Sequence, residues 1–343
     1  MKVLFLATNS PILEAGTRYR VAQYLNHVSA AGHHTTLHTF FPAQGGRSWK
    51  RTARGLLQRS SDIAQAHRYD LALVYRELLP HGINHAIPLV SAQVPYVFDF
   101  DDSVFLPTQK GWRALVSSPS STAKLVAGAK VVFAGNTYLG DYARQFSDRV
   151  EVLPTVVDTS RYCPITKPER KVPLIGWIGS YTTAPYLDRL LPMLDALAKD
   201  VAFKLRIVGT PRPIRLQNVE VECPRWSAET EHSFFQDLDV GLYPLTDDAW
   251  SRGKCGFKAI QYMACEVPSV VSPVGVVQEI VRDGRDGLWA SSLDQWREAL
   301  IRLLRDPDLR VTLGRSGRTR IESDYSLRAM APRFLAGLER ARR

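Results

Sequence analysis

Short apolar runs that alternate with amphipathic segments restrict the fold of this chain more than any other feature. In the first half, runs with strand character lie at residues 2–7, 34–40, 70–76, 95–100, 129–135 and 149–154. Helical spacing follows several of them, as in "RYRVAQYLNHVSAAG" and "TYLGDYARQF". Continuous apolar strands joined by helices indicate a parallel sheet covered on both faces. We therefore expect a doubly wound α/β domain.

The alternation pauses once and then restarts. Residues 162–173, "YCPITKPERKVP", are rich in proline and lysine and are typical of a linker. Apolar runs return at residues 174–180, 203–209, 219–224, 239–245 and 268–273. The sequence thus predicts two Rossmann-like domains, over residues 1–165 and 166–325, and a C-terminal helix over 326–343 that returns to the first domain. Two such domains facing one another would enclose a central cleft at the carboxyl ends of both parallel sheets.

Composition restricts the class of protein. The chain has 343 residues, of which 45% are hydrophobic, which is enough for two buried cores. The cysteines are scattered and show no metal-binding spacing, so we expect reduced thiols at Cys163, Cys223, Cys255 and Cys265. The opening "MKVLFLA" is too short for a secretory signal, and no later apolar run approaches the length of a membrane span. We expect a cytoplasmic protein.

A net charge of +10 predicts an anionic partner. Charge alone is compatible with nucleic acid, an anionic membrane surface or a phosphorylated substrate. One basic segment begins at Arg47 and places the apolar residues Trp49, Leu56, Leu57 and Ile63 beside the cations Lys50, Arg51, Arg54 and Arg59. This pattern is typical of a basic amphipathic helix that lies on an anionic membrane. A solvated helix that packs its apolar stripe on its own domain would have the same pattern.

A second basic cluster lies where a helix is expected to begin. The stretch "RGKCGFKAIQYMACEVPSVVSPVG" places Arg252, Lys254 and Lys258 around a loop, and helical spacing runs from Phe257 to Cys265. Unpaired N–H groups and the macrodipole already make a helix N-terminus positive, so added cations indicate an anionic ligand. We interpret the cluster as a phosphate site, with a solvated basic turn as the alternative.

Several separated motifs resemble a known enzyme family. In chain order they are "GTRYRVAQYLNHVSAAGHHTTLHTF", "VFDFDDSVF", "VVFAGNTYLGDYARQF", "VEVLPTVVDTSRY" and "GKCGFKAIQYMACEVPSVVSPVGVVQEIVRDGRDGLWA". Together they look like glycosyltransferase family 4. The resemblance implies an α/β fold of the GT-B type, with two Rossmann-like domains facing a cleft. It also implies transfer of a sugar from a nucleotide sugar with retention of anomeric configuration, without a metal or other cofactor.

The chain departs from the family's pattern at two acidic positions. Family members commonly have a Glu before this helix, which contacts the donor sugar, and a second Glu about eight residues later, which contacts the ribose. This chain has Gly253 and Gln261 there. A Gln amide still accepts from and donates to a ribose hydroxyl. Asp247 or Asp248 could contact the sugar instead, or be solvated turn residues.

The loop after the first strand of the second domain, "SYTTAPY", also lacks the cations that the family tends to place there. We therefore predict that Lys254 and Lys258 supply the positive charge for the donor diphosphate. Gln261 shares a helix face with Lys258 and is predicted to meet the ribose. Trp226 could stack on the base or pack beneath it. The predicted donor site also includes Gly179, Ser180, Gly209 and Arg225.

The first domain contributes a glycine and two arginines near its first helical segment. Gly16 could let a phosphate or sugar approach the backbone, or be an ordinary turn residue. Arg18 carries an unfavourable charge for a helix N-terminus unless an anion compensates it, so we assign both Gly16 and Arg18 to donor binding. Arg20 could equally be a surface residue.

Three aspartates gather at the end of a strand in "FDFDDS". The charges of Asp99, Asp101 and Asp102 repel unless solvent, a cation or a polyhydroxyl partner relieves them. We predict that Asp101 and Asp102 are catalytic, orienting the sugar or accepting the proton of the acceptor. Helix capping by Asp102 or Ser103 is the alternative. No histidine lies nearby, and we expect no metal.

These features predict a glycosyltransferase that moves a sugar from a nucleotide diphosphate sugar to a glycan or lipid-linked acceptor. Cell-envelope polysaccharide or glycoconjugate synthesis, at the inner face of the plasma membrane, is the biological setting that the family and the basic helix suggest. A nucleotide-sugar epimerase of the same fold and a nucleotide-binding pseudoenzyme remain alternatives. Nucleic acid is not an expected partner, because the net positive charge is the only feature of the sequence that favours it.

Overall fold

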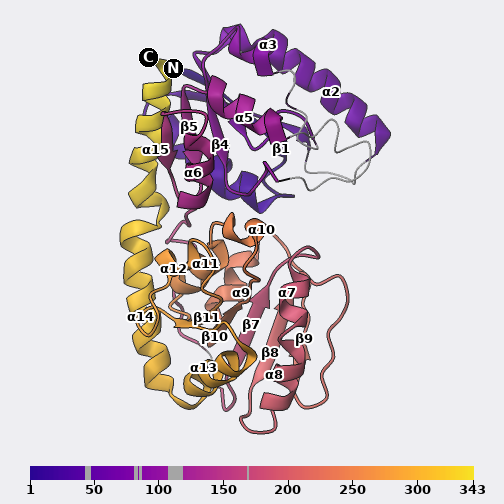
Figure 1. Cartoon of the computed structure of the whole chain (residues 1–343), viewed down its shortest axis with the longest axis vertical. Coiled ribbons are helices and arrows are strands. Elements are labelled where there is room, and N and C mark those ends of the chain that lie inside the picture. Colours follow the sequence, from indigo (N-terminus) through magenta and orange to yellow (C-terminus); the bar gives the residue numbers. More distant parts are fainter. Residues whose placement is uncertain (43–47, 81–83, 85–86, 107–118, 168–169) are drawn as a thin grey trace. The chain divides into compact units, whose positions relative to one another are not determined.

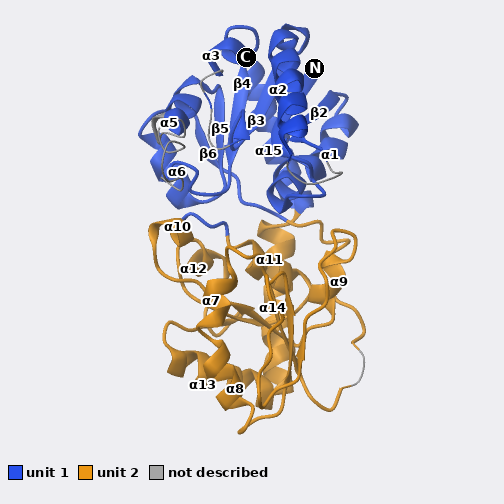
Figure 2. Cartoon of the chain, turned by 90° about the vertical axis from the view of Figure 1, so that its right-hand side faces the viewer, with its two compact units in different colours: residues 1–156, 253–255, 327–343 blue, residues 157–252, 256–326 orange. Residues whose placement is uncertain are grey.

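The computed structural model describes residues 1–42, 48–80, 84, 87–106, 119–167 and 170–343. The chain forms two compact units (Figure 2). Unit 1 comprises Met1–Val156, Gly253–Cys255 and Leu327–Arg343, and unit 2 comprises Val157–Arg252 and Gly256–Ser326. Arg47, Pro168 and Glu169, which belong to the basic segment and the expected linker, lie outside the described residues.

The described part of unit 1 contains a six-stranded parallel sheet in the order β2-β1-β3-β4-β5-β6. Its strands are β1 (Lys2–Asn9), β2 (His34–Phe41), β3 (Leu71–Tyr75), β4 (Tyr96–Phe100), β5 (Val131–Ala134) and β6 (Val150–Val152). The register pairs Val3 with Thr35 on one side and with Leu71 on the other. Every residue of β3, β4 and β5 is buried, as expected for strands covered on both faces.

Helices of unit 1 surround this sheet. Among the described residues they are α1 (Leu25–Ala30), α2 (Trp49–Ala64), α3 (Ile87–Ser91), α5 (Pro119–Gly128), α6 (Thr137–Arg144) and α15 (Leu327–Arg342). Figure 1 shows α15, the last helix of the chain, beside β4 and β5. The ring of Phe334 on α15 stacks on Tyr24 with centroids 4.2 Å apart and contacts Phe133 of β5. Aromatic burial thus holds the last residues of the chain in unit 1.

Unit 2 repeats the architecture. Its described residues form a six-stranded parallel sheet in the order β12-β11-β10-β7-β8-β9. The strands are β7 (Leu174–Ile178), β8 (Lys204–Val208), β9 (Val221–Glu222), β10 (Val240–Tyr243), β11 (Ser269–Val271) and β12 (Leu288–Trp289). The helices are α7 (Ala184–Asp188), α8 (Leu191–Leu197), α9 (Glu231–Gln236), α10 (Ala249–Arg252), α11 (Phe257–Ala264), α12 (Val277–Ile280), α13 (Leu293–Arg305) and α14 (Pro307–Asp324). The prediction of two parallel α/β sheets is confirmed.

The division between the units falls after Val156, earlier than the sequence composition suggests. Tyr162, at the start of the proline- and lysine-rich segment, is 3% exposed and packs its ring against Phe235, 5.8 Å away. Burial of an aromatic side chain stabilises a folded unit, whereas the side chains of a linker are typically exposed. Residues before the expected boundary are therefore part of unit 2.

The first helical segment of the sequence is divided in the structure. A π-helical turn, Thr17–Val21, leads into a 3-10 turn, Ala22–Tyr24, and only Leu25–Ala30 is α-helical. The π turn buries Arg20, which is 1% exposed. Single π turns are frequent at functional sites, because the widened turn redirects side chains.

Helix α2 directs apolar side chains outward. Trp49 is 76% exposed, Leu57 is 72% exposed and Leu56 is 47% exposed, whereas Gly55, Arg59 and Asp62 face the unit. The alternative in which α2 packs its apolar stripe on its own domain holds for Ile63, which packs against the unit 1 core, but not for Trp49, Leu56 and Leu57. Lys50 and Arg54 are exposed beside these apolar residues.

Arg59 does not belong to this outward basic face, contrary to the sequence-based assignment. It is 1% exposed, donates from Nη2 to the Ala7 carbonyl oxygen at 2.8 Å, and pairs with Asp62 at 3.4 Å. Burial lowers the pKa of Arg59 to about 10, against the raising effect of Asp62. Gly55 and Arg59 are four residues apart, so they lie on the same face of α2, the face that packs on unit 1. Within the described ranges, no helix is both long and apolar enough to cross a membrane.

Candidate functional site

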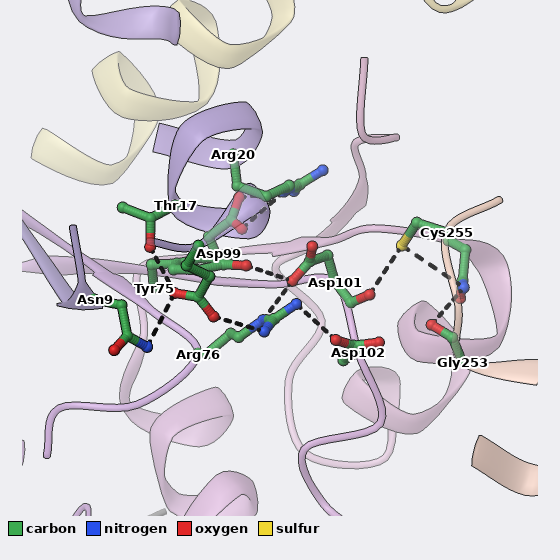
Figure 3. Close-up of polar contacts among 12 residues, drawn as sticks. Asn9, Thr17, Arg20, Tyr75, Arg76, Asp99, Asp101, Asp102, Gly253 and Cys255 are labelled. Atoms are coloured by element: carbon green, nitrogen blue, oxygen red, sulfur yellow. Dashed lines mark hydrogen bonds and ion pairs between the residues drawn. The ribbon is translucent and has the colours of Figure 1, made fainter. Parts of the chain in front are cut away.

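Arg76 lies at the carboxyl edge of the unit 1 sheet and contacts three carboxylates. It follows β3 directly, and its φ of 59° places a non-glycine residue in the left-handed region. Its Nε is 2.6 Å from Asp101 Oδ1, its Nη2 is 2.6 Å from Asp102 Oδ2, and its Nη1 is 3.0 Å from Glu14 Oε1. We call these four residues the Arg76 cluster; Figure 3 labels Arg76, Asp101 and Asp102. A strained backbone held by surrounding structure is typical of functional sites.

The parallel sheet explains why these residues meet. Strands β3 and β4 are neighbours, so the residues that follow them lie at the same edge, and the Arg76 N–H donates to the Asp99 carbonyl oxygen at 2.7 Å. The guanidinium is the cation that relieves the repulsion expected between Asp101 and Asp102. Tyr75 adds a hydrogen bond from its hydroxyl to Asp101 Oδ1 at 2.7 Å.

The two aspartates of the cluster have opposite pKa shifts. Burial alone would raise the pKa of the Asp101 carboxyl, but the charge of Arg76 and its hydrogen bond bring that pKa below its usual value. Burial and the Asp101 charge raise the pKa of the Asp102 carboxyl, although Arg76 and Lys254 oppose the shift. Pairs of carboxyls pushed apart in this way serve as acid and base in many enzymes. Asp102 is the member of the pair better suited to hold a proton.

A second ion pair lies beneath the Arg76 cluster. Arg20 Nε and Nη2 donate to the two carboxylate oxygens of Asp99 at 2.9 and 2.7 Å, and Arg20 Nη1 donates to the Leu153 carbonyl oxygen. Burial raises the pKa of the Asp99 carboxyl, and Arg20 counteracts that shift. The surface role that the sequence allowed for Arg20 is therefore wrong.

Gly253–Cys255 form part of unit 1 and complete this edge. Asn136 Nδ2 donates to the carbonyl oxygens of Gly253 and Lys254 at 3.0 and 3.1 Å, and the Cys255 thiol donates to the Asp101 carbonyl oxygen at 3.2 Å. A Cβ at position 253 would lie 1.8 Å from Ser103 Oγ, so this close approach requires glycine. Lys254, predicted to meet the donor diphosphate, lies near enough to Asp102 to lower its pKa.

The glycine and arginine assigned to donor binding in unit 1 have protein partners. A Cβ at Gly16 would lie 1.9 Å from the Tyr75 hydroxyl oxygen, so Gly16 permits the loop to pack on Tyr75. Arg18 donates from Nη1 to the Pro11 carbonyl oxygen at 2.7 Å and lies 4.9 Å from the Tyr19 ring centroid. These contacts account for both residues locally and leave their predicted roles as predictions.

The basic cluster in unit 2 is partly neutralised. Arg252 pairs with Asp247 at 2.6 Å, and Asp248 Oδ1 accepts the Ser251 N–H at 2.7 Å, which caps α10. Lys258, in the first turn of α11, lies 5.5 Å from the ring centroid of Tyr243, a cation–π distance. Asp247 and Asp248 thus have structural partners.

Gln261 lies on the buried side of α11. It is 3% exposed, and its Nε2 is 2.9 Å from Glu231 Oε1 and 3.0 Å from the Tyr162 hydroxyl oxygen. Tyr162 in turn lies 3.4 Å from Glu231 Oε1. Gln261 therefore belongs to a hydrogen-bonded triad with a carboxylate from α9.

A cavity of about 820 Å³ opens beside this triad in unit 2. Its volume lies within the range of small-molecule sites. The predicted residues Arg225 and Trp226 contribute to its wall, and Trp226 is 41% exposed. Other wall residues include Ile178, Val208, Phe234 and Glu231, and an ion-paired group formed by Arg206, Glu222 and Asp237. The structure thus brings Arg225 and Trp226 together with Glu231.

Gly179 and Gly209, which directly follow β7 and β8, approach one another closely. Gly209 has a φ of 88°, and a Cβ there would lie 2.1 Å from the Gly179 carbonyl oxygen. Only glycine fits this conformation and this distance. The Ser180 N–H donates to Thr183 Oγ1 at 2.9 Å and begins the turn before α7.

Sequence reasoning missed five residues of these two arrangements. Arg76 directly follows a buried strand, and that position was a usable signal, because the carboxyl ends of parallel strands carry ligand sites. The other four gave no local signal, since their partners are distant in sequence: they are Glu14, Tyr75, Tyr162 and Glu231.

Comparison with known proteins shows that the chain is similar to glycosyltransferases. Residues 172–306, most of unit 2, match the family model described as glycosyl transferases group 1. A GDP-mannose-dependent monoacylated alpha-(1-6)-phosphatidylinositol monomannoside mannosyltransferase of Corynebacterium glutamicum is 27% identical over 260 residues, 65% of this chain. Unit 2 is thus similar to the group 1 glycosyltransferases. The resemblance predicted from the motifs is confirmed.

A second similar protein is the D-inositol 3-phosphate glycosyltransferase of Pseudarthrobacter chlorophenolicus, 26% identical over 141 residues, 40% of this chain. The matched parts span 66% of the length of the mannosyltransferase and 32% of this second relative. The chain thus spans less than two thirds of the length of these two relatives.

Solved structures extend the likeness to the fold of both units. A glycosyltransferase from Rickettsia africae matches with a TM-score of 0.73 at 13% identity, over 99% of this chain and 98% of that one. Sucrose-phosphate synthase from Thermosynechococcus elongatus has a TM-score of 0.68 at 14% identity, over 97% of each chain. Anabaena HepE, solved in complex with UDP, has a TM-score of 0.68 at 14% identity, over 99% of this chain and 100% of that one. The fold is GT-B.

Proposed function

We propose that this chain is a retaining glycosyltransferase that moves a sugar from a nucleotide diphosphate sugar to a glycan or lipid-linked acceptor. The observation that carries the proposal is the coincidence of the family-model match, over residues 172–306, with the cavity of unit 2. Its wall has an aromatic ring at Trp226 and a cation at Arg225, groups that suit a base and a phosphate.

The proposed chemistry requires the charge of the leaving diphosphate to be stabilised as the glycosidic bond breaks. Lys258 and the N-terminus of α11 supply positive potential without a metal. The departing phosphate takes the proton of the acceptor hydroxyl when the acceptor enters on the face that the leaving group vacates. Asp101 and Asp102 are the candidate groups for orienting the sugar, or for accepting that proton in place of the departing phosphate.

The donor chemistry is tested by product formation. UDP-glucose and GDP-mannose are the first donors to use, because HepE was solved with UDP-glucose and the mannosyltransferase is GDP-mannose-dependent. Nucleoside diphosphate release is measured with and without glycan and lipid-linked acceptors. Acceptor-dependent release supports the transferase, and the anomeric coupling constant of the product in NMR tests retention.

The alternatives give different outcomes in the same experiment. Isomerised sugar nucleotide without an acceptor would indicate an epimerase. Nucleotide binding without turnover of any donor would indicate a pseudoenzyme, for which the Gln and Gly at the family's two acidic positions are the supporting observation.

An anionic membrane surface is the proposed location of the acceptor. The outward face of α2 carries Trp49, Leu56 and Leu57 beside Lys50 and Arg54, and this arrangement suits an interfacial helix. We place the protein at the inner face of the plasma membrane, in cell-envelope polysaccharide or glycoconjugate synthesis.

A further inference from the structure

Glu231 presents a carboxylate in the wall of the unit 2 cavity. It begins α9 and is 7% exposed. A buried carboxylate is costly unless hydrogen bonds replace its water. Gln261 Nε2 supplies one at 2.9 Å, and the Tyr162 hydroxyl lies 3.4 Å away. These two neutral groups help to hold the carboxylate in place at the cavity.

Gln261 and Glu231 are chemically matched. Both Nε2 hydrogens of Gln261 have acceptors within 3.0 Å, at Glu231 and Tyr162, so the amide has one favoured orientation. A carboxylate at position 261 would face that of Glu231 at this distance, and the two charges would repel. The amide at 261 is thus the residue that allows a carboxylate at 231. The acidic group absent from α11 is present on α9.

The surroundings of Glu231 define the chemistry of its ligand. A carboxylate accepts hydrogen bonds from two neighbouring hydroxyls, as on the vicinal diol of a ribose. Trp226 in the same wall offers a ring on which a base can stack, and Arg225 offers a cation. The wall also contains Arg206, which pairs with Glu222 and Asp237 at 2.8 and 2.7 Å. Trp226, Arg225 and Glu231, around a cavity of about 820 Å³, suit a nucleoside better than a purely anionic ligand.

We propose that Glu231 binds the ribose hydroxyls of the donor nucleotide and that Gln261 is its positioning residue. This inference rests on the proposed function, because it requires a nucleotide donor in unit 2. It assigns the ribose contact to α9, where the motif on α11 contains no acidic residue.

The test uses calorimetric binding of UDP and GDP and of their 2′,3′-dideoxy analogues. The unmodified protein should bind the better diphosphate about ten- to a hundredfold more tightly than its dideoxy form, since a charge-assisted hydrogen bond to the diol is lost. Glu231→Gln should remove this preference. Gln261→Glu should weaken binding, and the double variant Glu231→Gln with Gln261→Glu should restore part of the preference, because one amide again faces one carboxylate.

Control variants separate binding from folding. Glu298→Gln changes an exposed carboxylate on α13 and should leave every affinity unchanged. Glu231→Asp, which keeps the charge on a shorter side chain, should retain a reduced preference if Glu231→Gln fails to fold. Thermal unfolding checks each variant.

Three outcomes overturn the inference in distinguishable ways. If UDP or GDP binds and the dideoxy form binds equally well, no group of this protein recognises the diol, and the proposed function stands. If the Glu231→Gln variant keeps the full preference, another residue holds the ribose. If neither diphosphate binds, the proposed function fails and the inference fails with it.

Discussion

Arg20 and Asp99 form a bidentate ion pair in which neither side chain is more than 1% exposed, with N–O distances of 2.9 and 2.7 Å. Removing one partner leaves an uncompensated charge in the interior. The Arg20→Leu variant should therefore lose about 3–5 kcal/mol of unfolding free energy, measured by chemical denaturation. Asp99→Asn added to it should recover part of the loss.

The exposed pair Arg212 and Asp188 provides the matched comparison. Its side chains are 69% and 38% exposed and their charged atoms are 3.4 Å apart. Arg212→Leu should cost less than about 1 kcal/mol. Equal losses for Arg20→Leu and Arg212→Leu would contradict a structural role for the buried pair.

Because Arg76 has a left-handed backbone conformation, we expect Arg76→Gly to be more stable than Arg76→Ala, the reverse of the usual order. Both Arg76→Gly and Arg76→Ala remove the guanidinium, but only Ala keeps a Cβ at the observed φ of 59°. Arg76→Gly should unfold with a free energy higher by about 1 kcal/mol than Arg76→Ala. At Glu298, inside α13, the order should reverse, because Gly is a poorer helix former than Ala. The same order at both positions would argue against the left-handed conformation.

Asp286 predicts a pH-dependent contribution to the stability of unit 2. Burial would raise its pKa, but hydrogen bonds from Arg282 and Ser316 lower it below its usual value. A lowered folded-state pKa stabilises the protein above the unfolded pKa, near 4, and this stabilisation is lost as the pH falls further. The difference in unfolding free energy between the unmodified protein and Asp286→Asn should therefore shrink below about pH 4. If the difference in unfolding free energy between the two proteins were the same at pH 7 and pH 3, the stabilising contact between Arg282 and the Asp286 carboxylate would be contradicted.

The outward face of α2 predicts binding to anionic vesicles. Lys50→Glu with Arg54→Glu should weaken binding to phosphatidylserine-containing vesicles by more than about tenfold, since each basic residue contributes about 1 kcal/mol. Trp49→Ala with Leu57→Ala should weaken it through the loss of apolar burial. Charge reversal at Arg302 and Arg305, in the last turn of α13, is the control. Vesicle binding that survives both α2 variants would exclude this surface.

We expect the donor diphosphate to bind beside Lys258. Lys258→Ala should weaken binding of UDP or GDP by about ten- to a hundredfold and leave the affinity for the nucleoside unchanged. Lys254→Ala should act in the same direction and also raise the pKa of the Asp102 carboxyl, which Lys254 lowers. Arg252→Ala, whose charge is already paired with Asp247, should have little effect. Unchanged diphosphate binding in the Lys254→Ala and Lys258→Ala double variant would show that these cations are solvated surface groups.

The sequence by itself determined the two parallel sheets and the edges that carry the candidate residues. Strand periodicity and helical spacing are local properties, and the observed β1 and β4 overlap the apolar runs that predicted them. The position of Arg225 and Trp226 after a strand also placed them in the wall of a cavity.

Only the tertiary structure decided which charges meet. Arg20 reaches Asp99 over 79 residues of sequence, and Gln261 reaches Glu231 over 30. Arg59 faces inward although its segment reads as a basic surface, because α2 turns Gly55, Arg59 and Asp62 toward the unit. Local patterns specify elements, whereas the pairing of buried polar groups depends on which strand ends and helix faces the folded chain brings within hydrogen-bond distance.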